Sequence, residues 1–133
     1  MRRVVITGLG AVSPLGNNVA TTFEGLLEGR SGIRRITKFD ITEFACQIAG
    51  EIRDLDISQW ISRKEAKKAD TFIQYAIIAA EEAVKDSGLE LDKVNSDRFG
   101  AIIGSGIGGL PMIERQHSVL LEKGPRRITP FFI

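Results

Sequence analysis

The spacing of apolar residues predicts three strands along the chain. β-Branched residues fill positions 4–6, and a second apolar run lies within 98–105 (RFGAIIGS). Continuous runs of this kind are typical of strands buried on both faces, as in parallel or mixed sheets. A weaker signal over 45–52 is compatible with one more short strand.

Two shorter helices are predicted from their end signals. Asn17 or Asn18 can cap a helix that Gly29 would end. A second helix is predicted over 111–122, with a proline in its first turn and Gly124 as its stop. The apolar face of the first helix would hold Val19, Ala20, Phe23, Leu26 and Leu27.

The clearest helical signal begins at Ser62 and ends at Gly88. Ser62 and Glu65 match a capping box, and Gly88 suits a left-handed stop. Apolar residues then recur at the three- and four-residue spacing of a buried face. Because many of them are alanines, we expect another helix or a sheet to approach closely. The face is formed by Ala69, Phe72, Ile73, Ala76, Ile77, Ala80, Ala83 and Val84.

Composition limits the class of protein. The 133 residues suit one domain, 43% are hydrophobic and 26% charged, and the net charge of +1 gives no reason to expect nucleic-acid binding. A single cysteine excludes an internal disulfide and a multi-cysteine zinc site, and no apolar run reaches the roughly 18 residues of a membrane span. We therefore expect a cytoplasmic protein without a membrane segment. Because the sequence stops on three large apolar residues, we also expect it to be the front part of a longer chain.

Two glycine motifs invite a nucleotide-binding interpretation. The first, after the strand at 4–6, lacks the third glycine of the dinucleotide fingerprint and has Pro14 where a helix should begin. The second, Gly104-x-Gly106-x-x-Gly109, matches the pattern but is followed by a basic turn at 123–127 instead of an acidic residue. We favour glycines that allow close packing, and we expect no cofactor.

Cys46 and His117 are the only thiol and the only imidazole. A Cys–His pair is conceivable, but Cys46 has no helix N-terminus or cation beside it to favour the thiolate. A buried structural cysteine and a surface histidine are the favoured interpretations, and no metal site is expected.

Basic residues gather at the start of the long predicted helix. Lys64, Lys67 and Lys68 are spaced so that they would project together. Cations at a helix N-terminus oppose the helix dipole, so an acidic partner would explain them as well as ordinary solvated charge does.

Five stretches together resemble the N-terminal part of β-ketoacyl-acyl-carrier-protein synthases, most closely the type II members of the family. They are VVITGLGAVSPLG, SRKEAKKADTFIQYA, DSGL, GAIIGSGIGGL and GPRRITPFFI, in that order. The resemblance implies an α/β thiolase-like fold with layered helices and a mixed sheet, of which residues 1–133 would be the incomplete front part of the N-terminal half.

The resemblance also implies a decarboxylating condensation in fatty-acid elongation. An acyl group on a cysteine would be attacked by the carbanion that malonyl-carrier protein forms on losing carbon dioxide. The cysteine and two assisting histidines would lie downstream of residue 133, and Cys46 and His117 do not match them. The sequence given would therefore hold no catalytic residue and be inactive alone.

Binding residues implied by the resemblance do fall inside the sequence. Lys64, Lys67 and Lys68 match positions that meet the acidic acyl carrier protein, and Arg126 and Arg127 match a second basic contact from the other subunit of a homodimer. Ile107 matches a position of the acyl pocket, and Phe132 one that reaches into the partner's pocket. Three alternatives stay open: a non-catalytic module that docks an acidic partner, a polyketide-type condensing enzyme, and a nucleotide-dependent oxidoreductase.

Overall fold

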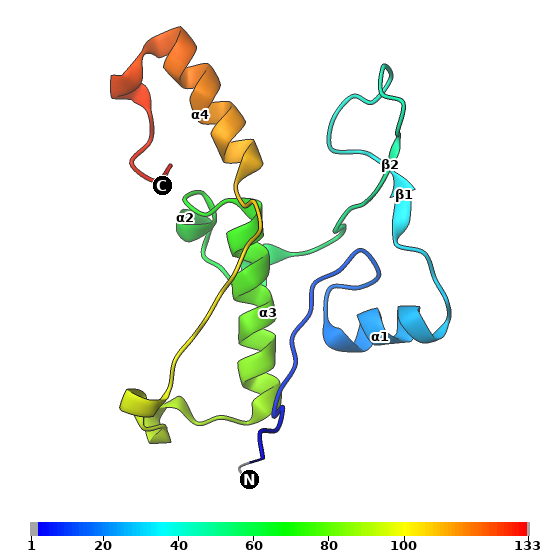
Figure 1. The fold of residues 1–133 in the computed structure, drawn as a ribbon, viewed down its shortest axis with the longest axis vertical. Helices are drawn as coiled ribbons and strands as arrows, with labels where there is room; N and C mark the ends of the chain where they lie inside the picture. Colours follow the sequence, from blue (N-terminus) through cyan, green and yellow to red (C-terminus); the bar gives the residue numbers. More distant parts are fainter. Residues whose placement is uncertain (1–2, 133) are drawn as a thin grey trace. The chain divides into compact units, whose positions relative to one another are not determined.

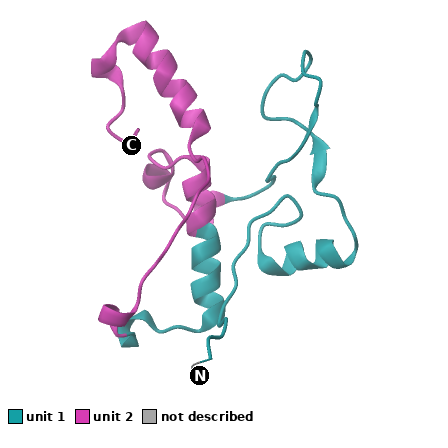
Figure 2. Ribbon diagram, in the orientation of Figure 1, with its two compact units in different colours: residues 1–56, 78–94 teal, residues 57–77, 95–133 magenta. Residues whose placement is uncertain are grey.

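The computed structural model describes residues 3–132 and divides the chain into two compact units. Unit 1 contains the chain up to residue 56 together with 78–94, and unit 2 contains 57–77 together with the chain from residue 95 onward (Figure 2). Helix α3, Thr71–Ser87, begins in unit 2 and ends in unit 1 (Figure 1). The chain is a helix-rich α/β arrangement with a small sheet, which confirms the predicted α/β class.

In unit 1, the N-terminal segment runs directly along α3. A Cβ on Gly8 would lie 2.2 Å from the carbonyl oxygen of Ala83, and one on Gly10 would lie 1.8 Å from that of Ala79. Only glycine allows two backbones to come this close. A close approach therefore occurs at Ala83, but the neighbour is an irregular segment and not the helix or sheet that we expected.

Two carboxylates of α3 hold this segment in place. Asp86 accepts a hydrogen bond from the backbone N–H of Leu9 at 2.9 Å. Glu82 accepts one from Ala11 and one from Val19, each at 2.9 Å, so it joins the segment to the first residue of α1. The backbone of 9–19 thus gains acceptors without a neighbouring strand.

Helix α1, Val19–Leu27, forms as predicted. The side chain of Asn18 caps it by accepting a hydrogen bond from the N–H of Thr21 at 2.8 Å, and Gly29 follows its end at a φ of 65°. Its predicted apolar face is not buried, however, since Phe23 is 58% exposed and Leu27 73%.

The sheet is a two-stranded antiparallel pair of β1, Ile33–Arg35, and β2, Ile48–Gly50. Strand β2 lies inside the weak 45–52 signal, and β1 was not predicted. Beside the pair, the buried Glu51 carboxylate accepts hydrogen bonds from the N–H and hydroxyl of Thr37, the N–H of Lys38 and the guanidinium of Arg53. These bonds, chiefly the one from the Thr37 N–H, lower the pKa of Glu51 from 4.5 to about 2, although burial acts in the opposite direction.

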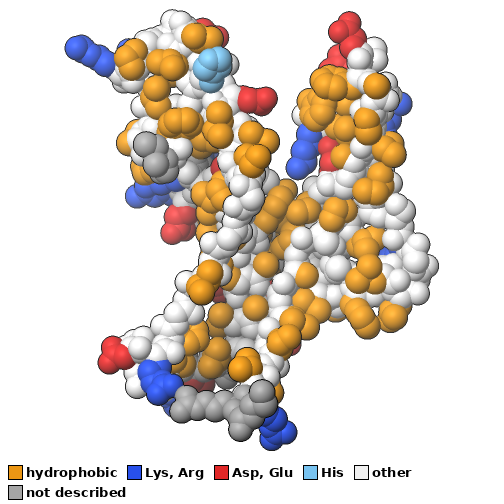
Figure 3. All heavy atoms as spheres, viewed as in Figure 1, with side chains coloured by type: hydrophobic (Ala, Val, Ile, Leu, Met, Phe, Trp, Pro, Cys, Tyr) orange, Lys and Arg blue, Asp and Glu red, His pale blue; other side chains and the backbone are white. Residues whose placement is uncertain are grey.

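The strands predicted at 4–6 and 98–105 are wrong. Neither segment has strand pairing, Val4 is 95% exposed and Ile102 98%, and η3, Ser96–Arg98, occupies the start of the second. A buried strand requires hydrogen-bonded neighbours and a covering layer, and residues 3–132 supply neither to these segments. Apolar side chains consequently lie on the visible surface of the molecule (Figure 3).

The single helix predicted from Ser62 is also wrong, because the chain breaks it in two. Helix α2, Arg63–Ala66, is separated from the start of α3 by four residues. The side-chain amide of Gln74 donates to the carbonyls of Ala66 and Ala69 at 3.0 and 2.9 Å, which supplies the acceptors at the end of α2 with a donor.

The buried face of α3 differs from the predicted one. Ile78, which the predicted face omitted, is 1% exposed, whereas Phe72, Ile73 and Ile77 are between 37% and 39% exposed. The three large side chains of the predicted apolar stripe are therefore partly exposed, whereas its alanines and Val84 are half-buried.

Helix α4, Leu110–Lys123, confirms the predicted third helix, with a proline in its first turn and Gly124 after its end at a φ of 79°. The short helix η4, Pro125–Arg127, follows, and the remaining short helices are η1, Ile57–Gln59, and η2, Leu91–Lys93. The side-chain carbonyl of Gln116 accepts from the N–H of Thr129 at 2.8 Å, so the last residues return along α4. Within the described part of the chain, no helix has the length and apolar character needed to cross a bilayer.

Candidate functional site

A basic hollow lies in unit 2 between α2, with the residues that directly follow it, and the segment after η4. It has a volume of about 560 Å³, and we use the name basic hollow for the set of residues that lines it. Those residues are Arg63, Lys64, Lys67, Lys68 and Phe131. The structure thus brings together the three lysines that the sequence singled out.

The local fold explains why these cations gather. Ser62 caps α2 by accepting a hydrogen bond from the N–H of Glu65 at 3.3 Å, and Ile61 beside it is 4% exposed, which anchors the turn. Because α2 ends at Ala66, Lys67 is its C-terminal cap and Lys68 follows it. Lys67 and Lys68 therefore lie at the C-terminal end of α2, where cations are favourable, so the predicted opposition to a helix dipole is wrong for these two. Lys64 is the second residue of α2, at its N-terminal end, as predicted.

Phe131 gives the basic hollow an aromatic wall. The ammonium nitrogen of Lys68 lies 4.8 Å from the ring centroid of Phe131, within the range of a cation–π contact, and the ring is half exposed. A surface that combines four cations with an aromatic ring can take a partner that offers carboxylates or phosphates beside an apolar group.

Two lining residues were not among the binding residues that the resemblance implies. Arg63 belongs to the same basic cluster of the sequence as the three lysines, so its place here follows from the sequence. Phe131 reaches the hollow only through the return of the chain after α4, which local sequence patterns do not reveal.

The second predicted basic contact does not join the first. Arg127 lines a different hollow of unit 2, of about 630 Å³, together with Val119 and Lys123. Arg126 is exposed in η4 and lines neither hollow.

The two predicted pocket residues are both exposed. Ile107, in the loop before α4, is 79% exposed, and Phe132, in the turn after Thr129, is 37% exposed. In the same loop, a Cβ on Gly108 would lie 2.6 Å from the ring of Phe72, so the predicted close packing of this glycine motif is confirmed at Gly108. Gly104 and Gly106 have open space around them.

Cys46 belongs to unit 1 and His117 to unit 2. Cys46 is exposed, so its predicted burial is wrong, and its thiol donates to the carbonyl of Ile48 at 3.5 Å. His117 is exposed as predicted. Among residues 3–132, no three His, Cys, Asp or Glu side chains are grouped so that they could hold a metal ion.

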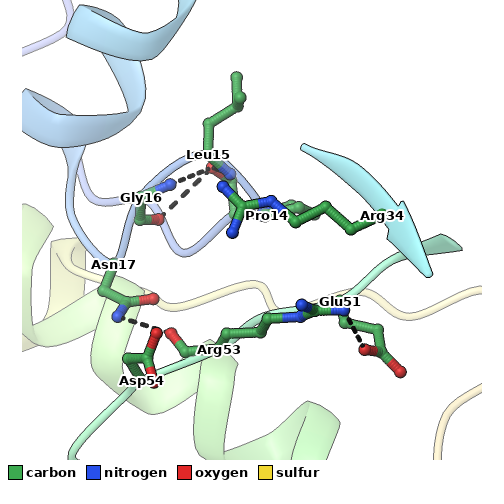
Figure 4. A pocket seen from close by; sticks show the side chains of 9 residues that line it. Pro14, Leu15, Gly16, Asn17, Arg34, Glu51, Arg53 and Asp54 are labelled. Atoms are coloured by element: carbon green, nitrogen blue, oxygen red, sulfur yellow. Dashed lines mark hydrogen bonds and ion pairs between the residues drawn. The ribbon is translucent and has the colours of Figure 1, made fainter. Parts of the chain in front are cut away.

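A smaller hollow of about 180 Å³ lies in unit 1 between the 13–17 turn and the segment after β2 (Figure 4). Its polar groups are largely engaged with one another: the Asn17 amide donates to the Arg53 carbonyl at 3.0 Å, and the Arg53 guanidinium pairs with Glu51 at 2.9 Å. Cations and carboxylates alternate around it, which gives it no preference for a charged ligand. We interpret it as a structural junction.

Solved structures with this arrangement are ketosynthases. The ishigamide ketosynthase/chain length factor matches with a TM-score of 0.77 at 34% identity, over 98% of this chain and 33% of that one. A second match is the structure of a type II polyketide synthase acyl-carrier protein in complex with its ketosynthase bound to the hexaketide. The TM-score is 0.77 at 29% identity, over 96% of this chain and 34% of the matched chain. The chain therefore has the fold of about a third of a ketosynthase.

The chain belongs to the β-ketoacyl synthase family, since the model of that family's N-terminal domain matches residues 1–133. It is 52% identical to 3-oxoacyl-acyl-carrier-protein synthase 2 of Vibrio harveyi over 132 residues, which are 99% of this chain and 32% of that protein. The chain thus spans about a third of the length of the curated relatives it matches.

Proposed function

We propose that residues 1–133 are the N-terminal third of a 3-oxoacyl-acyl-carrier-protein synthase of fatty-acid elongation. The observation that carries the proposal is the 52% identity that extends over 132 residues to a relative of that name. In the proposed reaction, a malonyl thioester loses carbon dioxide, its carbanion attacks an acyl-cysteine thioester, and the cysteine thiolate leaves. The cysteine and the two assisting histidines would lie outside this chain.

Within this proposal, the basic hollow docks the acidic carrier protein. Lys64, Lys67 and Lys68 are exposed and line one concave surface, and positive surfaces of this kind steer acidic partners. A ketosynthase of this fold has been solved with an acyl-carrier protein, which supports a partner of that class. Phe131 would offer an apolar contact at the centre of the same surface.

Other elements of the proposal concern the assembled enzyme. Arg126 and Arg127 would supply a second carrier contact from the other subunit of a homodimer. Ile107 and Phe132 would line acyl pockets, the second in the partner subunit. The enzyme would act in the cytoplasm.

The docking surface is tested by reversing its charge in the full-length protein. We expect Lys64→Glu, Lys67→Glu and Lys68→Glu together to raise the KM for carrier-bound substrate about tenfold or more at low salt, because each lost pair contributes roughly 0.2–1 kcal/mol and each new like charge repels. The kcat/KM for a substrate on a pantetheine fragment should hardly change. The effect should shrink as salt rises, since the Debye length falls from about 10 Å at 0.1 M to about 3 Å at 1 M.

A matched control separates docking from net charge. Lys38→Glu, Lys85→Glu and Arg98→Glu remove the same charge at three exposed positions outside the basic hollow. Equal effects of the two triple variants, or an unchanged KM in the first, would contradict the docking surface. Absence of condensation by the unaltered full-length protein would contradict the proposed reaction itself.

A polyketide-type condensing enzyme is the second candidate. It is favoured by one solved neighbour, a type II polyketide synthase acyl-carrier protein in complex with its ketosynthase. The identity of 29% to that neighbour is below the 52% to 3-oxoacyl-acyl-carrier-protein synthase 2 of Vibrio harveyi. Incubation with malonyl-carrier protein and a reduced acyl-carrier thioester distinguishes the two: one round of elongation supports fatty-acid synthesis, and repeated extension without reduction supports the polyketide alternative.

A further inference from the structure

Asp70 is a buried acid that the proposed function does not use. It lies between α2 and α3 and is 6% exposed. Asp70 and Glu51 are the two buried polar side chains in the part of the chain that the structure describes. A carboxylate this enclosed requires hydrogen-bond donors, and the identity of its donors indicates its role.

The two oxygens of Asp70 serve two different helices. Oδ1 accepts from the N–H of Thr71 at 2.7 Å, at the start of α3. Oδ2 accepts from the N–H of Met112 at 3.0 Å, at the third residue of α4 and 42 residues further along the chain. One side chain therefore ties the start of α4 to the start of α3.

Helix α4 depends on this distant cap. Its own cap residue is Gly109, which has no side chain to accept a hydrogen bond, and Pro111 has no N–H. Asp70 supplies the acceptor, and its negative charge lies where the dipole of a helix favours an anion. Removing it leaves the first turn of α4 without a side-chain acceptor.

The loop before α4 is fixed at the same place. Gly108 packs so closely on Phe72 that a Cβ would lie 2.6 Å from the ring, and Gly109 adopts a φ of 73°. Gly104 and Gly106 have no atom within 4 Å of a built Cβ, so the contacts at 108–112 are what hold the end of the loop. Ile107 is the residue immediately before this fixed point.

We propose that Asp70 is a positioning residue that fixes Ile107 through α4 and thereby sets which acyl chains the enzyme accepts. The second part of this inference rests on the proposed function, in which Ile107 lines the acyl pocket. Asp70 itself touches no substrate, because its oxygens are engaged by backbone N–H groups.

The test uses Asp70→Ser in the full-length protein. Serine keeps a cap for α3 but has a single oxygen, closer to the backbone, so it cannot also hold Met112. We expect the ratio of kcat/KM for a long to a short acyl thioester to change by at least about threefold, mainly through KM, while the KM for malonyl-carrier protein stays the same. Asp92→Ser, which removes an exposed acid, is the matched control and should leave the ratio unchanged.

Two further variants keep the inference testable if Asp70→Ser does not fold. Asp70→Asn retains one acceptor and should give a smaller shift of the ratio. Gly108→Ala places a Cβ against the ring of Phe72, so the loop and the ring must separate. We expect it to change the ratio of kcat/KM for long and short acyl thioesters while Asp70 stays intact. A uniform loss for all acyl lengths in these variants would overturn the specificity role.

Hydrogen exchange separates this inference from the proposed function. The amide of Met112 should exchange about tenfold faster in Asp70→Ser than in the unaltered protein, and by a smaller factor in Asp70→Asn, whether or not the protein condenses thioesters. Unchanged exchange would overturn the positioning role. Inactivity of the unaltered protein toward every thioester would overturn the proposed function and with it the specificity role.

Discussion

Replacing Gly10 with alanine should detach the N-terminal segment from α3. An alanine Cβ at this position would lie 1.8 Å from the carbonyl oxygen of Ala79 and 2.8 Å from the backbone nitrogen of Ala83. Ordinary contact begins near 3.4 Å, so the segment must move by about 1.6 Å. Both obstacles are helical backbone, which cannot turn aside as a flexible side chain can.

The magnitude follows from what the movement breaks. Overpacking a well-packed interface costs about 1–3 kcal/mol. The displacement also stretches the hydrogen bonds from Leu9 to Asp86 and from Ala11 to Glu82, both 2.9 Å long, and bonds to charged groups contribute roughly 1.5–3 kcal/mol each when enclosed. Because these two are partly open to water, we expect a local loss of about 3 kcal/mol, which corresponds to a roughly hundredfold change in opening.

Hydrogen exchange followed by mass spectrometry measures this opening at the Leu9 and Ala11 amides. Gly100→Ala is the matched control, since a Cβ there meets nothing within 4 Å and its φ is not in the left-handed region. We expect the control to leave exchange at Leu9 and Ala11 unchanged. If Gly10→Ala changed it by less than about threefold, the close approach of the segment to α3 would not be the contact that holds it.

Two further predictions concern the remaining parts of the chain. The pKa of Glu51 is about 2 in the folded protein against 4.5 ordinarily, so its contribution to stability is present above pH 4.5 and is lost as the pH falls toward 2. Hydrogen-exchange protection of the Thr37 and Lys38 amides, corrected for intrinsic exchange rates, should therefore fall over this range. In Glu51→Gln this protection should no longer depend on pH. Because Val4, Ile6 and Ile102 are between 82% and 98% exposed, residues 1–133 expressed alone should self-associate, and a monomer in sedimentation with a cooperative melt would contradict this.

The helix ends could be predicted because their signals are local. Asn18, Gly29 and Gly124 act on backbone groups within a few residues, and each occupies the predicted place. The strand predictions failed for the opposite reason. A run such as 4–6 records a preference for a buried sheet, but the partner strands that would satisfy it belong to no segment of the described chain.

The candidate site divides in the same way. Lys64, Lys67 and Lys68 are close in sequence, so their gathering could be predicted without knowing the fold. Phe131 and Asp70 could not be assigned, since each acts across dozens of residues through a contact that no periodicity marks. The break between α2 and α3 was missed because the capping box at Ser62 marks where a helix begins and carries no information on its length.

The predicted face of α3 shows where periodicity itself misleads. Apolar spacing included Ala83, which the N-terminal segment approaches. It omitted the buried Ile78 and the acids Glu82 and Asp86, which bind the backbone of that segment. These acids would ordinarily be assigned to solvent, but the segment at 9–19 presents free N–H groups that need acceptors, and carboxylates bind them more strongly than neutral groups do. A helix that packs against irregular backbone therefore needs polar residues on its inner face.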